Sequence, residues 1–287
     1  MIGWDAIAAA LPAGFEFAHA TPLNGGCINQ AWRIEGRNGQ RYFVKLNDAN
    51  KLSVFETESA ALDGIATTHT IRVPQVIAHG AAGEHAFLAL EYFDLNNDGN
   101  ARLLGQQLAA MHRNTAEQFG YPHDNMLGGT PQRNGWSSDW IAFWREQRLG
   151  FQLELAARNG HGGQLQKMGR ELMQLLPQLF GDYRPVPSLL HGDLWGGNHA
   201  YLADGTPLLF DPAPYYGDRE ADLAMTELFG GFAPEFYAAY RAAWPLDAGY
   251  ATRKILYNLY HILNHANLFG GAYAKQAEGM MQQLLNA

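Results

Sequence analysis

A glycine-punctuated loop at residues 191–198 carries the side chains best suited to chemistry. It reads His-Gly-Asp-Leu-Trp-Gly-Gly-Asn, so Asp193 and Asn198 lie five positions apart, and Asp211 ends a short apolar run soon after. Phosphoryl transfer uses such a set, in which one Asp accepts a hydroxyl proton while an Asn and an Asp hold Mg²⁺. The H-x-D-x-x-x-x-N spacing is met at each defined position. A polar loop with two caps would contain similar residues, so other parts of the site must decide.

Lys45 is a second candidate, because it interrupts the apolar, strand-like run at residues 42–46. In the helix expected to follow, Glu58 shares one stripe with Phe55 and Leu62. A carboxylate on a buried face requires a partner, and Lys45 is the nearest one available. A strand lysine paired with a helix glutamate positions nucleotide phosphates in kinases. The alternative is a lysine whose alkyl chain lies along the sheet and whose charge stays in water.

Two weaker signals flank the strand that carries the lysine. Gly25 and Gly26 precede it, and there the backbone N–H groups could approach an anion closely. Cys27 is either a small apolar filler or an accessible thiol whose oxidation would block nucleotide binding. Residues 88–93 end a later strand, where backbone N–H and C=O groups could meet an adenine edge.

The elements that must position these groups indicate two lobes. Four strand-like runs lie at residues 31–34, 41–46, 72–78 and 85–92. Asn38 and Gly39 are expected to supply the left-handed turn positions between the first two runs. One helix lies between the strand pairs, with Ser53 and Glu56 as its capping box, so Glu56 is interpreted as solvated rather than as the partner of the lysine.

Polar, turn-rich residues 93–100 mark the expected boundary, which divides the chain into residues 1–94 and 95–287. Helices are expected at residues 103–112, 136–157, 163–180, 219–228, 234–244 and 251–267, with a strand-like piece at 207–211. The predicted fold is therefore α+β, with a small antiparallel-sheet lobe that carries one helix and a larger helical lobe.

Composition excludes several classes of protein. The 287 residues are 47% hydrophobic and 17% charged, which argues against disorder, and the net charge of −8 argues against nucleic-acid binding. A single cysteine forms no intrachain disulfide. No apolar run approaches the length of a membrane span, and the N-terminus does not resemble a signal peptide. We expect a cytoplasmic protein, monomeric unless Cys27 joins two chains.

Other residues of interest have simpler interpretations. Trp136, Trp140 and Trp144 recur at helical spacing and are expected in the core. His261 and His265 stand four apart on a helix without a third ligand, so we expect structural histidines rather than a metal site. Trp195, within the glycine-punctuated loop, could stack on a sugar or form a wall of the pocket.

Together these parts resemble the fructosamine/ketosamine-3-kinase family almost end to end. The similarity is carried by residues 25–31, 42–45, 55–58, 119–120, 125–128, 140–144, 148–149, 191–198, 211–222, 228–231 and 263–270. The string His-Gly-Asp-Leu-Trp and the pattern D-P-A-x-Y-x-G-x-R-E-x-D at 211–222 are the specific ones. The departures are Gly196, where Ser is more usual in the family, and a D-P-A context with no A-P-E after it, which suits a small-molecule kinase without a regulated activation loop.

The resemblance implies a kinase-like fold that uses ATP and Mg²⁺ to phosphorylate the sugar 3-hydroxyl of ketosamines, free or on protein lysines. The phosphorylated adduct is unstable, so the implied role is deglycation repair. By position, Asp193 is the proton acceptor, and Asn198 and Asp211 bind Mg²⁺. Lys45 and Glu58 position phosphates, beside the glycine pair and Cys27. The remaining implied roles are the adenine hinge at Glu91, Tyr92 and Phe93, the substrate candidates Trp195 and Asp218, and a brace for the catalytic loop formed by His191 and Asp222.

Two alternatives stay open at this point. Another small-molecule kinase of the same fold, acting on an aminoglycoside, choline or homoserine, would share the loop and the later aspartate. A catalytically inactive ATP-binding module would not need the intact set of Lys45, Glu58, Asp193, Asn198 and Asp211.

Overall fold

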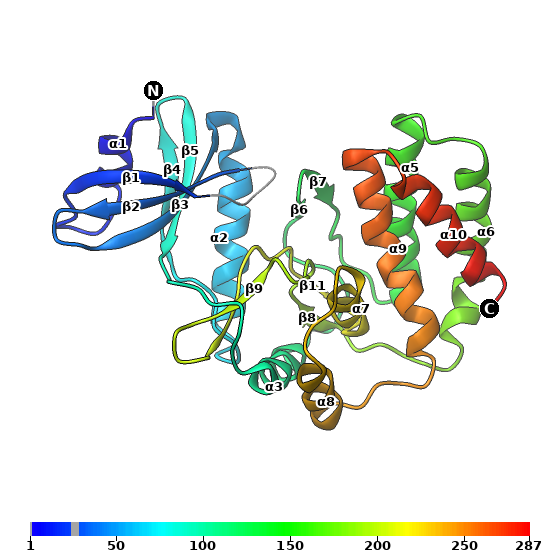
Figure 1. The fold of residues 1–287 in the computed structure, drawn as a ribbon. Coiled ribbons are helices and arrows are strands. Elements are labelled where there is room, and N and C mark those ends of the chain that lie inside the picture. The colour runs from blue at the N-terminus through cyan, green and yellow to red at the C-terminus, as the bar shows by residue number, and fades with distance from the viewer. Residues whose placement is uncertain (1, 24–28) are drawn as a thin grey trace. The chain divides into compact units, whose positions relative to one another are not determined.

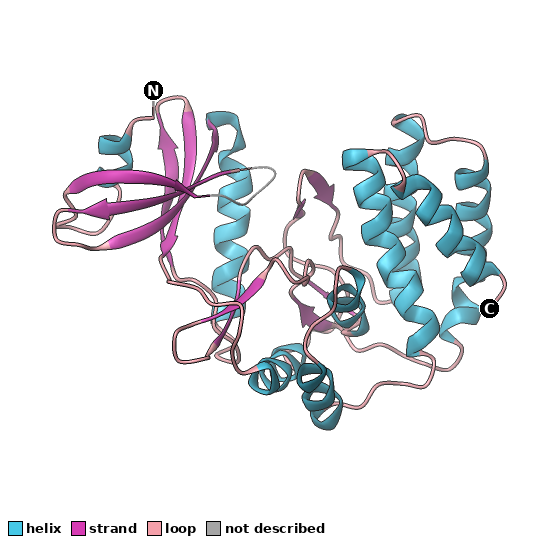
Figure 2. Ribbon diagram, in the orientation of Figure 1, coloured by secondary structure: helices cyan, strands magenta, loops and turns pink. Residues whose placement is uncertain are grey.

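The computed structural model describes residues 2–23 and 29–287, and the chain forms two compact units. The N-terminal unit comprises residues 1–100 and 199–212, and the C-terminal unit comprises residues 101–198 and 213–287. Figure 1 traces both units along the chain, and Figure 2 shows that the large sheet belongs to the first and most of the helices to the second.

The N-terminal unit contains a five-stranded antiparallel sheet in the order β1-β2-β3-β5-β4. Its elements are α1 (Trp4–Ala9), β1 (Phe17–Leu23), β2 (Gln30–Gly36), β3 (Arg41–Asp48), η1 (Ala49–Lys51), α2 (Leu52–Ala66), β4 (Val76–Ala82) and β5 (His85–Glu91). Three of the four strands expected from the sequence are confirmed, and the fourth, expected at residues 72–78, begins four residues later as β4. Strand β1 and helix α1 were not predicted, so the unit has a second helix.

Strand alternation assigns the two faces of this sheet. Tyr42, Val44 and Leu46 of β3 are buried in a cluster that includes Ile7 of α1. The intervening Lys45 therefore belongs to the opposite face. Helix α2 contacts β4 and β5. Its apolar stripe, represented by Phe55, is fully buried.

Two local predictions in this unit were wrong. Between β2 and β3 only Gly39 has a positive φ, of 79°, because the side chain of Asn38 instead accepts a hydrogen bond from the N–H of Gln40 at 3.0 Å. Helix α2 begins at Leu52 without a side-chain cap. Ser53 therefore lies inside the first turn, and its carbonyl accepts from the Thr57 hydroxyl at 2.7 Å, so there is no Ser53–Glu56 capping box.

A short hairpin from late in the sequence belongs to the N-terminal unit. It consists of β9 (His199–Tyr201) and β10 (Pro207–Leu209). The N–H of Leu209 donates to the Arg72 carbonyl at 3.0 Å, and Tyr201 and Asn96 exchange two backbone hydrogen bonds. These bonds explain why the N-terminal unit extends to Asn100 and includes residues 199–212. The predicted division of the chain into residues 1–94 and 95–287 does not include this later segment in the N-terminal unit.

The C-terminal unit is mainly helical, as expected from the sequence. Its helices are α3 (Ala101–His112), α4 (Trp140–Phe143), the π-helix η2 (Trp144–Gly150), α5 (Phe151–Arg158), α6 (Gln164–Phe180), α7 (Glu220–Leu228), α8 (Pro234–Ala243), α9 (Tyr250–Phe269) and α10 (Tyr273–Leu285). Its short strands are β6 (Asn125–Leu127), β7 (Thr130–Gln132), β8 (Ser188–Leu190) and β11 (Tyr215–Gly217), paired as β6–β7 and β8–β11. Helix α10 was not predicted.

The tryptophan stripe is only partly a core feature. Trp140 and Trp144 are buried as expected. Trp136 precedes the helix, is 46% exposed and stacks on Tyr216 at a centroid distance of 6.2 Å. The reason is that Asp139 caps α4 by accepting a hydrogen bond from the N–H of Ala142, at 2.6 Å, so the helix starts after Trp136.

Helices α3 and α8 pack closely because Gly105 faces α8. A Cβ atom at this position would overlap the carbonyl oxygen of Phe236 and approach the backbone nitrogen of Tyr240 to 3.1 Å. The side chain of Tyr240 is buried at this contact. A glycine is therefore required for this interhelical distance. Within the described residues, no helix is long and apolar enough to cross a membrane.

Candidate active site

Lys45 lies between two carboxylates of the N-terminal unit. Its Nζ is 2.6 Å from Glu58 Oε1 and 2.6 Å from Asp211 Oδ1, and the residue is 6% exposed. Burial lowers the pKa of Lys45, but the attraction of Asp211 and Glu58 outweighs it and raises the pKa above its usual value, so the ammonium group stays charged. The pKa of Glu58 is raised by burial, against the opposing effect of Lys45.

Asp211 follows β10 in an unusual backbone conformation. Its φ is +57°, and His69 is the other non-glycine residue with positive φ in the described part of the chain. Asp is among the few side chains that adopt this region readily. The side chain of Asp211 is 47% exposed, although Oδ1 contacts Lys45. The backbone turn thus presents a partly solvated carboxylate next to the buried ammonium group.

The loop that contains Asp193 is organised by Asn198. The Asn198 side-chain amide donates to the Asp193 carbonyl at 2.8 Å and to Asp193 Oδ2 at 3.2 Å. Because the amide nitrogen is used in this way, the Asn198 side-chain oxygen is oriented as the remaining acceptor. The N–H of Asp193 is 3.3 Å from Nδ1 of His191, which is fully buried.

Asp222 holds the start of this loop through its backbone. The carboxylate accepts hydrogen bonds from the N–H of His191 at 2.6 Å and from the N–H of Gly192 at 2.9 Å. These are the contacts that the predicted brace requires. Burial raises the pKa of Asp222 and the hydrogen bonds from His112 and from the Gly192 backbone lower it, so that on balance the pKa lies below its usual value.

Gly192 is required by the close approach of another backbone segment. Its φ is +82°, and a Cβ atom there would overlap the carbonyl oxygen of Ala213. The N–H of Ala213 in turn donates to the His191 carbonyl at 2.9 Å. The start of the loop is therefore held both by the backbone of Ala213 and by the carboxylate of Asp222.

Two residues without a predicted role anchor the segment that follows Pro212. Gln132 donates to the Ala213 carbonyl at 2.9 Å, and Asn125 donates to the Pro214 carbonyl at 2.8 Å. Gln132 also donates to the Asn125 side chain, at 2.8 Å, and accepts from the hydroxyl of Tyr260, at 2.9 Å. The β6–β7 hairpin is therefore a clamp on this backbone. Asn125 belongs to residues 125–128, one of the segments that carry the family resemblance, whereas no sequence signal marks Gln132.

The two predicted substrate candidates have different environments. Trp195 is 39% exposed and meets the Phe229 ring edge-on at 6.3 Å, so part of its face is accessible. Asp218 is fully buried and accepts hydrogen bonds from the hydroxyl groups of Tyr183, at 3.0 Å, and Tyr257, at 2.5 Å. The Asp218 carboxylate is thus held by hydroxyl groups of its own unit, and its contact with substrate stays a prediction.

Comparison with known proteins decides the family. The fructosamine kinase family model matches residues 4–287. The chain belongs to the fructosamine kinase family. A probable ketoamine kinase of Synechocystis is 48% identical over 276 residues, covering 94% of this chain and 92% of that protein. The chloroplastic protein-ribulosamine 3-kinase of Arabidopsis thaliana is 42% identical over 267 residues, covering 92% and 81%.

A solved structure supports the same assignment. The crystal structure of a provisionally assigned fructosamine-3-kinase from Haemophilus somnus matches with a TM-score of 0.90 and 30% identity, covering 98% of this chain and 97% of that one. An ADP-bound aminoglycoside phosphotransferase, at 11% identity and a TM-score of 0.65, shows the shared kinase-like fold. The predictions of family, of fold class and of a phosphotransferase are confirmed, and membership of a kinase family implies the use of ATP.

Several site predictions for this family member remain predictions. In the expected hinge, Glu91 forms an ion pair with Arg72 at 2.7 Å and, through its N–H, a 2.9 Å hydrogen bond with the Gln75 carbonyl. The guanidinium groups of Arg41 and Arg72 lie over the rings of Tyr92 and Phe93, at 4.8 and 5.5 Å. The side chains of the three expected hinge residues therefore each contact an arginine side chain. Gly25, Gly26 and Cys27 lie outside the described residues.

The histidines of α9 have the environment of structural groups. His261 is 5% exposed, and burial lowers its pKa to about 3, so it is neutral. Nδ1 of His265 is 2.8 Å from the His261 carbonyl oxygen. Within residues 2–23 and 29–287, no group of three or more His, Cys, Asp or Glu side chains is arranged to hold a metal ion.

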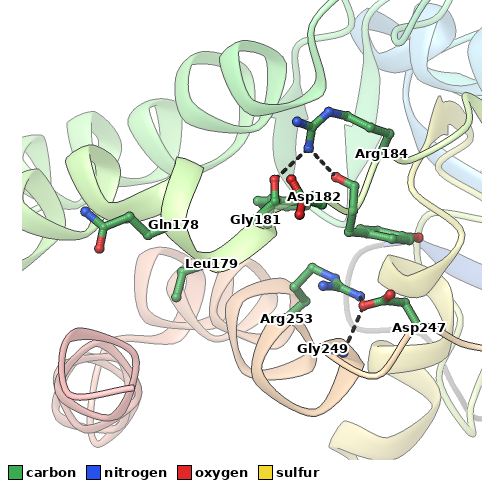
Figure 3. Close-up of a pocket in the computed structure, with 10 residues that line it drawn as sticks. Gln178, Leu179, Gly181, Asp182, Arg184, Asp247, Gly249 and Arg253 are labelled. Carbon is green, nitrogen blue, oxygen red and sulfur yellow. Dashed lines mark hydrogen bonds and ion pairs between the residues drawn. The ribbon is translucent and has the colours of Figure 1, made fainter.

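The C-terminal unit also contains a pocket of about 470 Å³ at the end of α6 and the start of α9 (Figure 3). Arg253 extends into it but is paired with Glu220 at 2.8 Å and with Asp247 at 2.7 Å. Arg184 donates to the carbonyls of Gly181 and Tyr183. Arg253 is thus already paired with carboxylates and Arg184 donates to backbone carbonyls, and none of the predicted site residues lines the pocket.

Proposed function

We propose that this member of the fructosamine kinase family transfers the γ-phosphoryl group of ATP to the sugar 3-hydroxyl of ketosamines. The observation that carries the proposal is the ion triad in which the buried Lys45 contacts both Glu58 and the partly exposed Asp211 at 2.6 Å. In a kinase, this group keeps a charged lysine in a fixed position for nucleotide phosphates. An inactive binding module has no use for the complete set.

In the proposed reaction, Asp193 orients the 3-hydroxyl and accepts its proton. The sugar oxygen forms a bond to the γ-phosphorus, and the bond between that phosphorus and the oxygen bridging to the β-phosphorus breaks, which releases ADP. Asn198 fixes Asp193 through its two hydrogen bonds. The contribution of these residues is positioning and charge stabilisation.

The oxygen donors of Asp211 and Asn198 suit Mg²⁺, which prefers a few carboxylate or carbonyl oxygens together with substrate phosphates. The Asp211 side chain is 47% exposed, and the Asn198 amide nitrogen is directed toward Asp193, which leaves its oxygen as the donor atom. We propose these two residues as the ligands. When bound, Mg²⁺ would neutralise negative charge on the phosphates.

The proposed acceptors are sugar adducts of amines, either free or on protein lysines. The Arabidopsis relative is named as a kinase of protein ribulosamines. Because 3-phosphorylated adducts are unstable and release the amine, the proposed activity is a deglycation repair. Trp195, partly exposed on the loop that carries Asp193, is the proposed sugar contact.

The test is Mg²⁺-dependent ADP release with ribulose-lysine, fructose-lysine, an aminoglycoside, choline or buffer alone. We expect release with ketosamines only, and the two sugars would then be ranked by kcat/KM. ADP release with choline or the aminoglycoside alone would leave the kinase assignment intact and show that the acceptor is not a ketosamine. ATP binding without turnover on any acceptor would contradict the proposal and favour the binding module.

A further inference from the structure

Asp222 is itself held by a chain of buried side chains in the C-terminal unit. His112, the last residue of α3, is fully buried, and its Nε2 lies 3.1 Å from Asp222 Oδ2. Its Nδ1 lies 2.7 Å from the hydroxyl of Tyr240 in α8. Arg219 donates to the same hydroxyl oxygen at 3.2 Å. Three helices, α3, α7 and α8, therefore meet around one imidazole ring.

The donors and acceptors of these four hydrogen-bonded side chains fit one arrangement. An ionised Asp222 can only accept, so Nε2 of His112 carries a proton. The guanidinium of Arg219 can only donate, so it uses an acceptor site of the Tyr240 oxygen, and the Tyr240 proton is free to point to Nδ1. A neutral imidazole protonated on Nε2 satisfies each group. An imidazolium would direct an N–H toward the Tyr240 hydroxyl, which would then need another acceptor.

The carboxylate of Asp222 is faced by few groups. From α3 it meets the His112 imidazole, and from the loop after β8 it meets the N–H groups of His191 and Gly192 and lies near the His191 ring. His112 is thus the one side-chain hydrogen-bond donor among the contacts described for Asp222. The backbone donors are the loop itself, so the direction of the carboxylate depends on His112.

We propose that His112 is a positioning residue for phosphoryl transfer, acting through Asp222 on the backbone that presents Asp193. Its Nε2–H fixes one oxygen of Asp222, and the two oxygens then fix the consecutive N–H groups of His191 and Gly192. The inference rests on the proposed function for its kinetic consequence, whereas the predicted tautomer of His112 can be tested without substrate.

The kinetic experiment compares three variants in the full chain. His112→Leu should lower kcat about 10- to 100-fold with the KM for ATP unchanged, since a misplacement of about 1 Å can cost about 100-fold. His112→Gln, which retains an N–H donor, should recover part of the loss. Leu108→Ala, one turn earlier and also fully buried, is the control for a general packing defect. It should lower the melting temperature while kcat stays near that of the wild type.

The pH profile separates positioning from stability. Without the His112 donor, Asp222 should take up a proton at higher pH, so the acidic limb of kcat should move to higher pH in His112→Leu and not in Leu108→Ala. A His112→Leu enzyme with reduced stability but with wild-type kcat and acidic limb would overturn the proposal.

Two further measurements keep the proposal testable if His112→Leu does not fold. Tyr240→Phe removes the hydroxyl that faces Nδ1. It should lower kcat several-fold and move the acidic limb of kcat to higher pH, as His112→Leu does. If kcat and the acidic limb were unchanged, the proposed role of His112 would be contradicted. Nitrogen-15 NMR of wild-type protein should show a proton on Nε2 of His112. A ring with its proton on Nδ1 alone would overturn the proposal even if no acceptor were phosphorylated, whereas a protonated Nε2 without turnover would refute only the proposed function.

Discussion

Nζ of Lys45 and Oε1 of Glu58 are 2.6 Å apart, and both side chains are almost completely buried. The strand period of β3 and the helix period of α2 direct these two groups to the same interior surface. Asp211 adds a second carboxylate to the ammonium group, at the same distance. The charged lysine is therefore held in place before any nucleotide binds.

Replacing the ammonium group should remove phosphate positioning. Lys45→Met should lower kcat/KM for ATP by about 100- to 1000-fold, the usual effect of deleting one preorganised cationic or hydrogen-bonding group. The measurement is steady-state ADP release at varied ATP. Lys51→Met removes an exposed lysine from the same unit and should behave as wild type. Equal effects of the two substitutions would contradict the assignment.

Asp193 should be needed for turnover and not for nucleotide binding. Asp193→Ala should lower kcat by about 1000-fold, within the range expected for loss of a general base. Calorimetric titration should still show ATP binding, because the triad around Lys45 does not include this residue. An Asp193→Ala enzyme that turns over at the wild-type rate would disprove the role.

Asp222 should make stability depend on acid pH. Its pKa is lower in the folded chain than the unfolded value of about 3.9. The ionised group therefore stabilises the fold above about pH 4, and this contribution is lost as pH falls through the lower, folded value. Asp222→Asn should cost about 3 kcal/mol at pH 7, with a smaller difference from wild type near pH 3. Urea unfolding across this range measures both quantities, and a constant difference would contradict the role of the charge.

Trp195 should contribute to binding of the sugar substrate. Trp195→Ala should raise the KM for a ketosamine about 10-fold, the value of one lost aromatic contact, while the KM for ATP stays the same. Trp136→Ala, which removes another exposed tryptophan of the same unit, is the control. An unchanged ketosamine KM in Trp195→Ala would show that this ring only walls the pocket.

The departure at Gly196 should carry little structural cost. A Cβ atom there meets only the Phe229 carbonyl oxygen, at 3.9 Å. Gly196→Ser should therefore change the free energy of unfolding by less than about 0.5 kcal/mol, as for an open surface position. Thermal unfolding of the variant tests this. A large loss of stability would mean that the loop is more crowded than its backbone indicates.

The sequence predicted those parts of the site that depend on local periodicity or on an unbroken motif. The pairing of Lys45 with Glu58 follows from alternation in a strand and a stripe on a helix. The loop of Asp193 and Asn198 follows from spacing within eight residues. The strands β2 to β5 and most helices follow from the same short-range patterns, although a helix start such as that at Asp139 depends on one cap.

The features that sequence reasoning missed depend on contacts between distant segments. His112 ends a helix with no pattern around it, and its partners lie 110 and 128 residues later in the chain. Gln132 is similar, since it clamps a backbone carbonyl 81 residues away. The burial of Asp218 was not predicted either, because a carboxylate at a helix start looks solvent-accessible until the hydroxyl groups of Tyr183 and Tyr257, from distant segments, contact it.

The close contact at Gly105 limits which sequences the fold tolerates. Since the Phe236 carbonyl occupies the space that a Cβ atom needs, even alanine would push α8 away from α3 and separate Tyr240 from His112. Neighbouring Gln106 is exposed and free of this restriction. In a library of single substitutions, position 105 should therefore accept no other amino acid at full activity, although it contributes no side chain to the reaction.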